Sequence, residues 1–161
     1  MQRMGGDVQI RRANPADFAA LGEVFHDAVR HGADLYSPAQ RAAWSPAPRA
    51  GRDWDDTLSG QHVWMAEENG QALGFLTLRP DGYIDLAYIR AAAQGRGLLG
   101  RLYREAEDGA RQLGLTRLWT DASLHAKPPF ESVGFAVTLP ETVIRNGEAF
   151  KRFQMEKRLN G

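Results

Sequence analysis

A glycine-rich turn that runs into an amphipathic segment constrains the fold more than any other feature of this sequence. Gly95, Gly97 and Gly100 form the turn, and Gly114 closes the segment that follows it. Apolar residues recur at every fourth position of that segment, which is the spacing of one face of an α-helix. The sequence therefore predicts a tight turn that enters a long helix, with Gly114 at its C-terminal end. The apolar stripe consists of Leu98, Leu102, Ala106 and Ala110.

Such a turn suits an anion, because the first amides of a helix have no acceptor within the helix. The helix dipole favours negative charge at the same place. Glycine lets a phosphate approach the backbone closely, and Arg96 and Arg101 add positive charge. The sequence therefore predicts a phosphate-bearing ligand at residues 95–100. The alternative is that the glycines only shape the connection between a strand and a helix.

The G-x-G-x-x-G spacing is also that of a dinucleotide-binding fingerprint, and Asp121 stands where the ribose-binding acid of such a fold would be. In that fold the strand ends almost at the first glycine. Here the strand-like run ends at Ile89, and the five residues RAAAQ separate it from Gly95. The residues after Asp121 read mostly as a β-hairpin instead of further strand–helix units. The sequence therefore argues against a dehydrogenase.

The rest of the chain alternates between strand-like and helix-like segments, which predicts a mixed α/β fold. Asn-Gly pairs at 69–70 and 146–147 favour two β-hairpins. Asn14-Pro15 and Ser37-Pro38 favour helix starts. Strands are expected at 8–13, 62–68, 71–78, 83–89, 116–121, 142–145 and 149–157. Helices are expected from Pro15 to about His31, from Pro38, around Trp54 and Leu58, over the apolar stripe, and within 126–135.

Length and composition limit the class of protein. A chain of 161 residues with 43% hydrophobic residues can bury one proper core, so we expect one domain over 1–161 with 1–7 as a ragged N-terminus. Basic and acidic residues both number 20, which favours neither a nucleic acid nor a membrane as partner. The chain contains no cysteine, and its four histidines lack helical metal-site spacing, so we expect no metal. The start of the chain does not resemble a signal peptide, so we expect a cytoplasmic protein.

Two stretches resemble the GNAT superfamily of acetyl-CoA-dependent N-acetyltransferases, and the likeness extends from Val8 to Leu159. They are YIDLAYIRAAAQGRG with the helix behind it, and ASLHAKPPFESVGF. The resemblance implies a central, mostly antiparallel mixed sheet of about seven strands flanked by helices. It also implies that an acetyl group moves from acetyl-CoA to a primary amine. The pattern is similar to a bacterial subgroup of largely unassigned substrate, so it does not name the acceptor.

The same resemblance implies which residues hold coenzyme A. In the family motif Q/R-x-x-G-x-G/A, backbone amides bind the pyrophosphate. Leu99 stands where glycine or alanine is usual, and Gly100 partly compensates. The strand before the loop pairs with the pantetheine arm. The implied residues are Leu86, Ala87, Tyr88 and Ile89 on the strand, and Gln94, Gly95, Arg96, Gly97, Leu98, Leu99 and Gly100 on the loop.

The second stretch departs from the family pattern N-x-x-A-x-x-F-Y-x-x-x-G-F at two places. Ser123 replaces the asparagine that often contacts pantetheine, and its hydroxyl can still hydrogen-bond. Phe130 replaces the tyrosine that often protonates the departing thiolate, so we expect its ring to pack on the pantetheine arm without donating a proton. A thiol has a pKa of about 8.5 and leaves readily, so this loss is tolerable.

An amine acceptor needs a base, because a lysine-like amine has a pKa of about 10.4 and arrives protonated. Asp85 is the first candidate, since strand alternation places it on one face of the sheet with Ile84 and Leu86 on the other. Alternatively, Asp85 pairs with an arginine or fixes a neighbouring loop. Glu67 and His125 are the second and third candidates for the base.

The acceptor pocket is expected to come from the segment after the first helix. Tyr36, Gln40 and Trp44 recur at a spacing of four and would share one face of a helix that begins early. We expect Trp54 only to pack. The chain offers no acidic groove for a protein acceptor, so a small-molecule amine is expected. Two alternatives are a CoA sensor without catalysis and an interaction module on the same scaffold, and the paired C-terminal strands are compatible with a homodimer.

Overall fold

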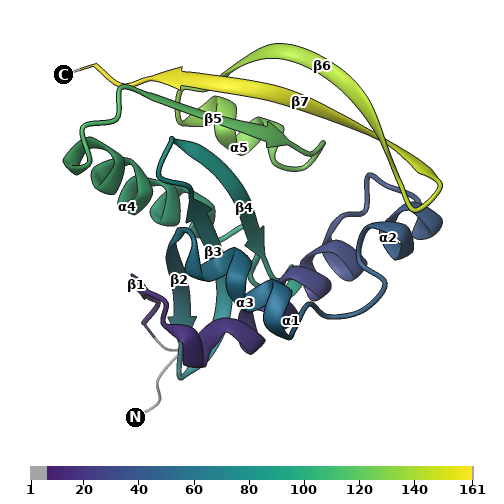
Figure 1. Ribbon diagram of the computed structural model, residues 1–161. Coiled ribbons are helices and arrows are strands. Elements are labelled where there is room, and N and C mark those ends of the chain that lie inside the picture. Colours follow the sequence, from purple (N-terminus) through teal and green to yellow (C-terminus); the bar gives the residue numbers. More distant parts are fainter. Residues whose placement is uncertain (1–6, 161) are drawn as a thin grey trace.

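The computed structural model describes residues 7–160 and contains one seven-stranded sheet (Figure 1). Its strand order is β1-β2-β3-β4-β5-β7-β6, and every pair is antiparallel except β4–β5. The expected mixed, mostly antiparallel sheet is therefore confirmed. Residues 1–6, most of the expected ragged terminus, lie outside the described residues. The strands are β1 (Gln9–Arg12), β2 (His62–Glu68), β3 (Gln71–Leu78), β4 (Tyr83–Ile89), β5 (Arg117–Ala122), β6 (Ala136–Arg145) and β7 (Glu148–Arg158).

Residues 7–160 contain five α-helices, and the first helical segment and α2 begin where the capping residues predict. Asn14 and Ser37 each form a capping box before a proline. Short helical turns at Pro15–Asp17 and Ala28–Gly32 extend the first helix at both ends, and a third turn spans Ala91–Ala93. The α-helices are α1 (Phe18–Asp27), α2 (Pro38–Trp44), α3 (Arg52–Ser59), α4 (Leu98–Gln112) and α5 (Lys127–Ser132).

Two hydrophobic cores lie on opposite faces of the sheet. Helices α1 and α3 cover one face, where Trp54 is fully buried and donates a hydrogen bond to the Phe18 carbonyl over 2.7 Å. Trp54 therefore packs, as expected. Helices α4 and α5 cover the other face, and the predicted apolar stripe of α4 is buried there. Both Asn-Gly pairs have positive φ angles at their two residues and connect β2 to β3 and β6 to β7.

The parallel strands β4 and β5 separate soon after they meet. Their register contains two Cα pairs, Tyr83 with Trp119 and Ile84 with Thr120. The Thr120 hydroxyl donates to the Ile84 carbonyl over 2.9 Å, and this contact stands at the point of separation. Beyond it the rest of β4 diverges from β5, and the strands form a wedge in Figure 1. The second half of β4 therefore has a backbone edge that β5 does not pair.

Strand β4 contains a β-bulge, so its side chains do not alternate as the sequence predicts. Leu78 pairs with Ile84 and Leu76 pairs with Ala87, so Asp85 and Leu86 together lie opposite one residue of β3, Thr77. The Leu86 amide donates to the Thr77 hydroxyl over 3.0 Å. Leu86 packs in the α1–α3 core, whereas Ile84 packs in the α4–α5 core. The prediction that Ile84 and Leu86 share a face was wrong, because the extra residue reverses the alternation.

The β6–β7 hairpin is longer than the sequence predicts and reaches across to α2 (Figure 1). Its first strand begins at Ala136 and includes Pro140, which an edge strand tolerates. Three hydrogen bonds hold its tip against the α2 region. Tyr36 Oη donates to the Lys151 carbonyl over 2.9 Å, Gln40 Nε2 to the Ala149 carbonyl over 2.6 Å, and Asn146 Nδ2 to the Ala43 carbonyl over 2.6 Å.

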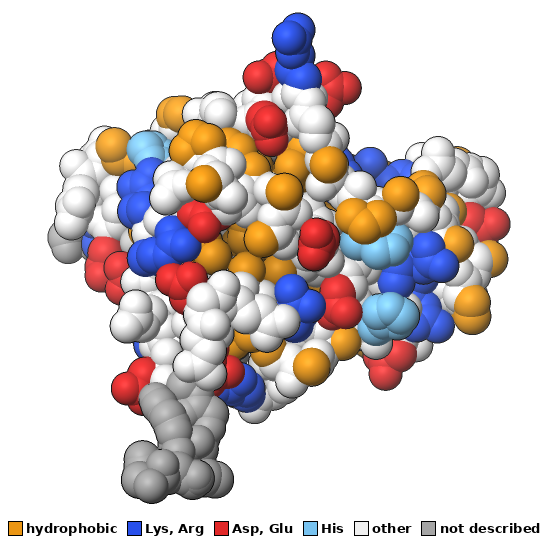
Figure 2. Space-filling view, turned by 90° about the horizontal axis from the view of Figure 1, so that it is seen from below, with side chains coloured by type: hydrophobic (Ala, Val, Ile, Leu, Met, Phe, Trp, Pro, Cys, Tyr) orange, Lys and Arg blue, Asp and Glu red, His pale blue; other side chains and the backbone are white. Residues whose placement is uncertain are grey.

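Charges on the visible surface are mixed. On the face seen from below, Figure 2 shows basic and acidic side chains interspersed with hydrophobic ones. Among residues 7–160, no helix has both the length and the apolar character needed to cross a bilayer. The expected homodimer stays a prediction.

Gly22 of α1 lies against the backbone of the segment before α3. A Cβ atom at Gly22 would lie 1.8 Å from the Arg49 carbonyl oxygen, so the backbone must move to admit it. We predict that Gly22→Ala lowers the free energy of unfolding by about 1–3 kcal/mol, the usual range for overpacking. Thermal or urea unfolding measures this. Gly60→Ala is the control, because its Cβ would meet only ordinary contact at 3.6 Å. Equal stability of the two variants would contradict the tight packing.

Candidate active site

The glycine turn leaves open space in front of the N-terminus of α4. Gly95 has a φ of 82° and Gly97 a φ of 74°, both in the left-handed region that favours glycine. A Cβ atom added at either position would meet nothing within 4 Å. Gly97 is the N-cap of α4, so the first amides of the helix follow it directly. The turn therefore has the open space and the helix N-terminus that an anion would need, and anion binding there stays a prediction.

A cavity of about 700 Å³ extends from this turn along β4 to α5. We call it the loop cavity. It is lined by the turn, by the last residues of β4 and by Ala126, Pro129 and Val133 of the α5 region. Ten of the residues expected to contact coenzyme A line it, namely Ala87, Tyr88, Ile89, Gln94, Gly95, Gly97, Leu98, Leu99, Gly100 and Ser123.

Three residues expected in that set lie elsewhere. Leu86 faces the opposite side of the sheet because of the bulge. Arg96 forms an ion pair with Glu68 at 3.0 Å. Phe130 is 3% exposed and packs edge-on against Phe135, with ring centroids 5.0 Å apart. These three side chains are absent from the lining of the loop cavity.

A second cavity of about 460 Å³ also adjoins β4, where Tyr83, Asp85 and Leu86 line it. We call it the hairpin cavity, because the β6–β7 hairpin forms one of its walls. The α2 region and the β4–β5 wedge form the others. Trp44, Tyr88 and Ser123 line both cavities, so the two spaces meet at these residues. The β6–β7 hairpin was not expected in the site, because it is distant from α2 in sequence and only the fold brings the two together. It contributes Val143, Arg145, Asn146, Phe150, Lys151 and Arg152.

Two carboxylates line the hairpin cavity. Asp85 accepts a hydrogen bond from Gln61 Nε2 over 2.8 Å and lies 3.6 Å from an Arg79 nitrogen. This arginine contact is the alternative that the sequence left open, and it occurs at a side chain that also faces the cavity. Asp121 was missed as a candidate base. Its Oδ2 accepts from the Tyr83 hydroxyl over 2.7 Å, and its buried Oδ1 has no partner among residues 7–160.

Tyr88 stands where the two cavities meet. Burial raises the pKa of its phenol, and the negative charge of Asp85 raises it further. The positive charges of Arg145 and Arg49 act in the opposite direction. The net rise keeps the phenol protonated at neutral pH, so Tyr88 is a hydrogen-bond donor at this junction.

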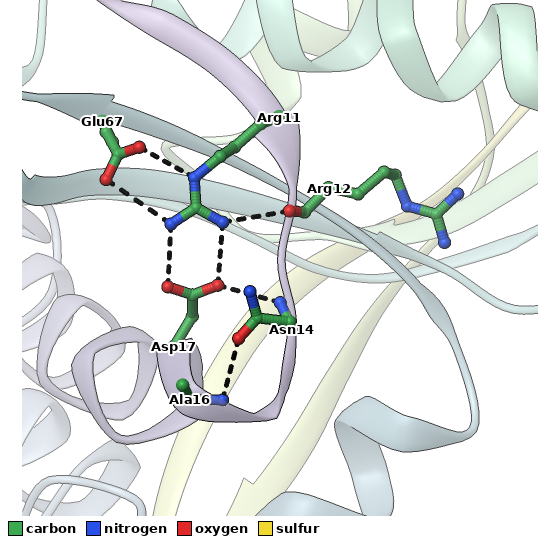
Figure 3. Close-up of polar contacts among 6 residues, drawn as sticks. All are labelled: Arg11, Arg12, Asn14, Ala16, Asp17 and Glu67. Carbon is green, nitrogen blue, oxygen red and sulfur yellow. Dashed lines mark hydrogen bonds and ion pairs between the residues drawn. The ribbon is translucent and has the colours of Figure 1, made fainter.

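Glu67 lies outside both cavities and belongs to a structural network (Figure 3). Arg11 donates from Nε to Glu67 over 2.7 Å and from Nη2 to Asp17 over 2.8 Å. Asp17 also caps the Asn14 amide, so the network ties β1 and β2 to the start of α1.

His125 lines the loop cavity, but its Nε2 atom already has neighbours. It lies 3.1 Å from the Leu35 amide and 3.0 Å from Asp34 Oδ1, and the tautomer decides which contact is a hydrogen bond. Its buried Nδ1 has no partner among residues 7–160. Among residues 7–160 as a whole, no group of three His, Asp or Glu side chains is arranged to hold a metal ion.

The three expected acceptor residues have different surroundings. Trp44 lines both cavities, at the end of α2. Tyr36 precedes α2, lines the hairpin cavity and accepts a hydrogen bond from the Leu124 amide over 2.9 Å. Gln40 caps Ser37 and holds the hairpin, and it lines neither cavity.

Comparisons with known proteins agree with this architecture. A family model described as an acetyltransferase (GNAT) domain matches residues 33–159. The uncharacterized N-acetyltransferase YafP of Escherichia coli K12 is 33% identical over 150 residues, which cover 92% of this chain and 95% of YafP. It is similar along nearly its whole length.

Two solved structures share the fold. A GCN5-related N-acetyltransferase from Rhodopseudomonas palustris has a TM-score of 0.87 and 30% identity, covering 99% of this chain and 100% of its own. YncA of Salmonella typhimurium, a putative acetyltransferase solved with acetyl-CoA, has a TM-score of 0.69 and 24% identity over 96% and 95% of the two chains. With the family model matching most of its length, this chain belongs to the GNAT family of N-acetyltransferases.

Proposed function

We propose that this GNAT acetyltransferase moves the acetyl group of acetyl-CoA directly to the primary amine of a small-molecule acceptor. The observation that carries the proposal is the meeting of two cavities at Trp44, Tyr88 and Ser123. One cavity contains the glycine turn, and the other contains the carboxylates Asp85 and Asp121. A donor in one cavity and an acceptor in the other can therefore approach each other at these residues.

The loop cavity fits acetyl-CoA on two grounds. The open space at Gly95 and Gly97, together with the first amides of α4, suits the diphosphate. The edge of β4 beyond Ile84, which β5 does not pair, offers backbone groups to the pantetheine amides in the manner of an added strand. YncA, which has this fold, was solved with acetyl-CoA.

The acceptor amine must lose a proton before it attacks, and a carboxylate in the hairpin cavity can accept it. Acetyl-CoA supplies an activated thioester. The acceptor ammonium first gives one proton to Asp85, directly or through water. The neutral amine then forms the new C–N bond as the C–S bond breaks, coenzyme A leaves as the thiolate, and the second amine proton passes to the thiolate or to water. The chain has no cysteine to carry an acyl group, so transfer is direct. Asp121, with its unpartnered Oδ1, is the second candidate for the base.

The leaving thiol needs little help, since its pKa is about 8.5. Phe130 cannot donate a proton to it, and its ring lies in the core. The Tyr88 phenol lies at the junction and is protonated at neutral pH, so it can donate a hydrogen bond to the departing sulfur.

The cytoplasmic location and the single domain expected from the sequence stay predictions.

The first prediction concerns the glycine turn. Gly97→Leu should abolish the rise in melting temperature that coenzyme A causes, because the side chain would fill the open space at the turn. A ligand at about 100 times its Kd stabilises the wild type by about 2.7 kcal/mol. Thermal shift with coenzyme A and acetyl-CoA measures the effect.

Gly114→Leu is the matched control. Gly114 lies beyond the other end of α4 with a φ of 78°, and its Cβ would also meet open space. Both variants therefore carry the same backbone strain of about 1–2 kcal/mol, but only Gly97→Leu should lose the ligand effect. NAD should not stabilise the wild type. If NAD stabilises it and acetyl-CoA does not, the donor site is wrongly placed.

The second prediction concerns the base. Asp85→Asn should lower kcat by about 10²–10⁴-fold, the usual contribution of a positioned proton acceptor. Raising the pH should recover part of the rate, because more amine is then neutral. The stabilisation by coenzyme A should not change, since the turn binds it elsewhere. Release of free thiol with a panel of amines, measured against pH, checks this.

Asp121→Asn is the comparison variant at the other carboxylate of the hairpin cavity. A larger, pH-recoverable loss in Asp121→Asn would transfer the role of base to Asp121. If Asp85 acts only as the partner of Arg79, its Asn variant should melt earlier and show a rate defect that pH does not repair. If the wild type binds acetyl-CoA but acetylates no amine in the panel, the chain is a CoA-binding sensor and the proposed reaction is wrong.

A further inference from the structure

The hairpin cavity is more basic than the chain around it. The chain has 20 basic and 20 acidic residues, but five basic and two acidic residues line this cavity. Two of the five have carboxylate partners. Arg79 lies 3.6 Å from Asp85, and Arg152 pairs with Glu141 at 2.5 Å. The remaining three are Arg49, Arg145 and Lys151, and none of them forms an ion pair within residues 7–160.

Arg145 lies on the side of the hairpin that faces the cavity. Arg145, Val143 and Phe150 share one face of the β6–β7 ladder, because paired and alternate residues point to the same side. Phe150 is buried against Tyr36, which fixes this face toward α2. Lys151 alternates to the other face, and its main chain accepts the Tyr36 hydroxyl. Arg152 shares the face of Arg145 but pairs with Glu141, so Arg145 is the cation without an ion-pair partner that this face presents.

Arg49, in the segment before α3, also lines the hairpin cavity. Its guanidinium lies 4.8 Å from the ring centre of Trp54 and 5.8 Å from that of Phe25, so an aromatic surface holds it in place. The charges of both Arg49 and Arg145 act on the Tyr88 phenol. Two arginines from segments far apart in sequence therefore come near the point where the two cavities meet.

We infer that the acceptor carries an anionic group, such as a carboxylate or a phosphonate, beside its amine, and that Arg145 and Arg49 bind this group. The inference rests on the proposed function. Guanidinium groups match such anions with paired hydrogen bonds, and unpaired cations in a hollow raise the local concentration of anions. The carboxylates of Asp85 and Asp121 face the same cavity and suit the ammonium. The cavity thus complements a zwitterion and disfavours a polyamine.

The test uses primary amines in matched pairs, in which one member carries a carboxylate or a phosphonate and the other carries a neutral amide or hydrogen. With the full-length protein and acetyl-CoA, the anionic member should have the higher kcat/KM. Arg145→Gln should reduce kcat/KM for that member by about 10–100-fold, mainly through KM, as expected for a lost charge-assisted hydrogen bond. For the neutral member, kcat/KM should change by less than about 3-fold, because that amine has no anionic group for Arg145 to bind.

Two further variants separate charge from structure. Arg145→Lys should retain part of the preference, since it keeps the charge. Arg158→Gln should behave as the wild type, because Arg158 is on the same hairpin, has a side chain 75% exposed and lines neither cavity. A preference that Arg145→Gln leaves intact, or that Arg158→Gln reduces equally, would overturn the inference. Carboxylate and phosphonate pairs, compared side by side, identify which anion fits.

A binding measurement distinguishes this inference from the reaction itself. The matched amines are titrated calorimetrically into the protein saturated with coenzyme A, so that no acetyl transfer takes place. The anionic member can bind, and bind more weakly to Arg145→Gln, without being acetylated in the kinetic assay. That result supports the anion site and refutes the proposed reaction. Acetylation of both members at equal rates supports the reaction and refutes the anion site.

Discussion

The separation of β4 from β5 is the constraint on which the rest of the structure depends. Two parallel residue pairs, at Tyr83 and Ile84, hold the strands together before they diverge. Unpaired backbone amides and carbonyls are costly when buried, so this edge favours a ligand that supplies the missing hydrogen bonds. The wedge also separates the loop cavity from the hairpin cavity except at Trp44, Tyr88 and Ser123. In the proposed reaction, the donor and the acceptor meet at these three residues.

The bulge decides which side chains reach that place. Because side chains alternate along a strand, one extra residue reverses the face of everything beyond it. Asp85 and Leu86 therefore lie on one side together, Ala87 turns to the α4 side, and Tyr88 returns to the junction. With unbroken alternation, Tyr88 would share the α4–α5 face with Ile84 and would not line the hairpin cavity.

Local signals in the sequence predicted the elements well. The Asn-Gly turns, the two capping boxes and the apolar stripe of α4 depend on neighbouring residues, and the structure confirms them. The bulge at Asp85, the burial of Phe130 and the approach of Arg145 depend on partners distant in sequence. No periodicity encodes such contacts, so the sequence anticipated most of the β4 and turn residues that line the loop cavity but few of the residues that line the hairpin cavity.

The two halves of the site use different chemistry. The loop cavity offers a ligand backbone amides at the glycine turn and open space at Gly95 and Gly97, so we expect substitutions away from these glycines to affect it little. The hairpin cavity is formed by side chains from α2, β4 and the β6–β7 hairpin, which the fold alone brings together. If Arg145, near the tip of this hairpin, binds the acceptor as proposed, substitutions there should alter the choice of acceptor while the glycine turn keeps its shape. In the proposed reaction, donor binding and acceptor choice are therefore separable.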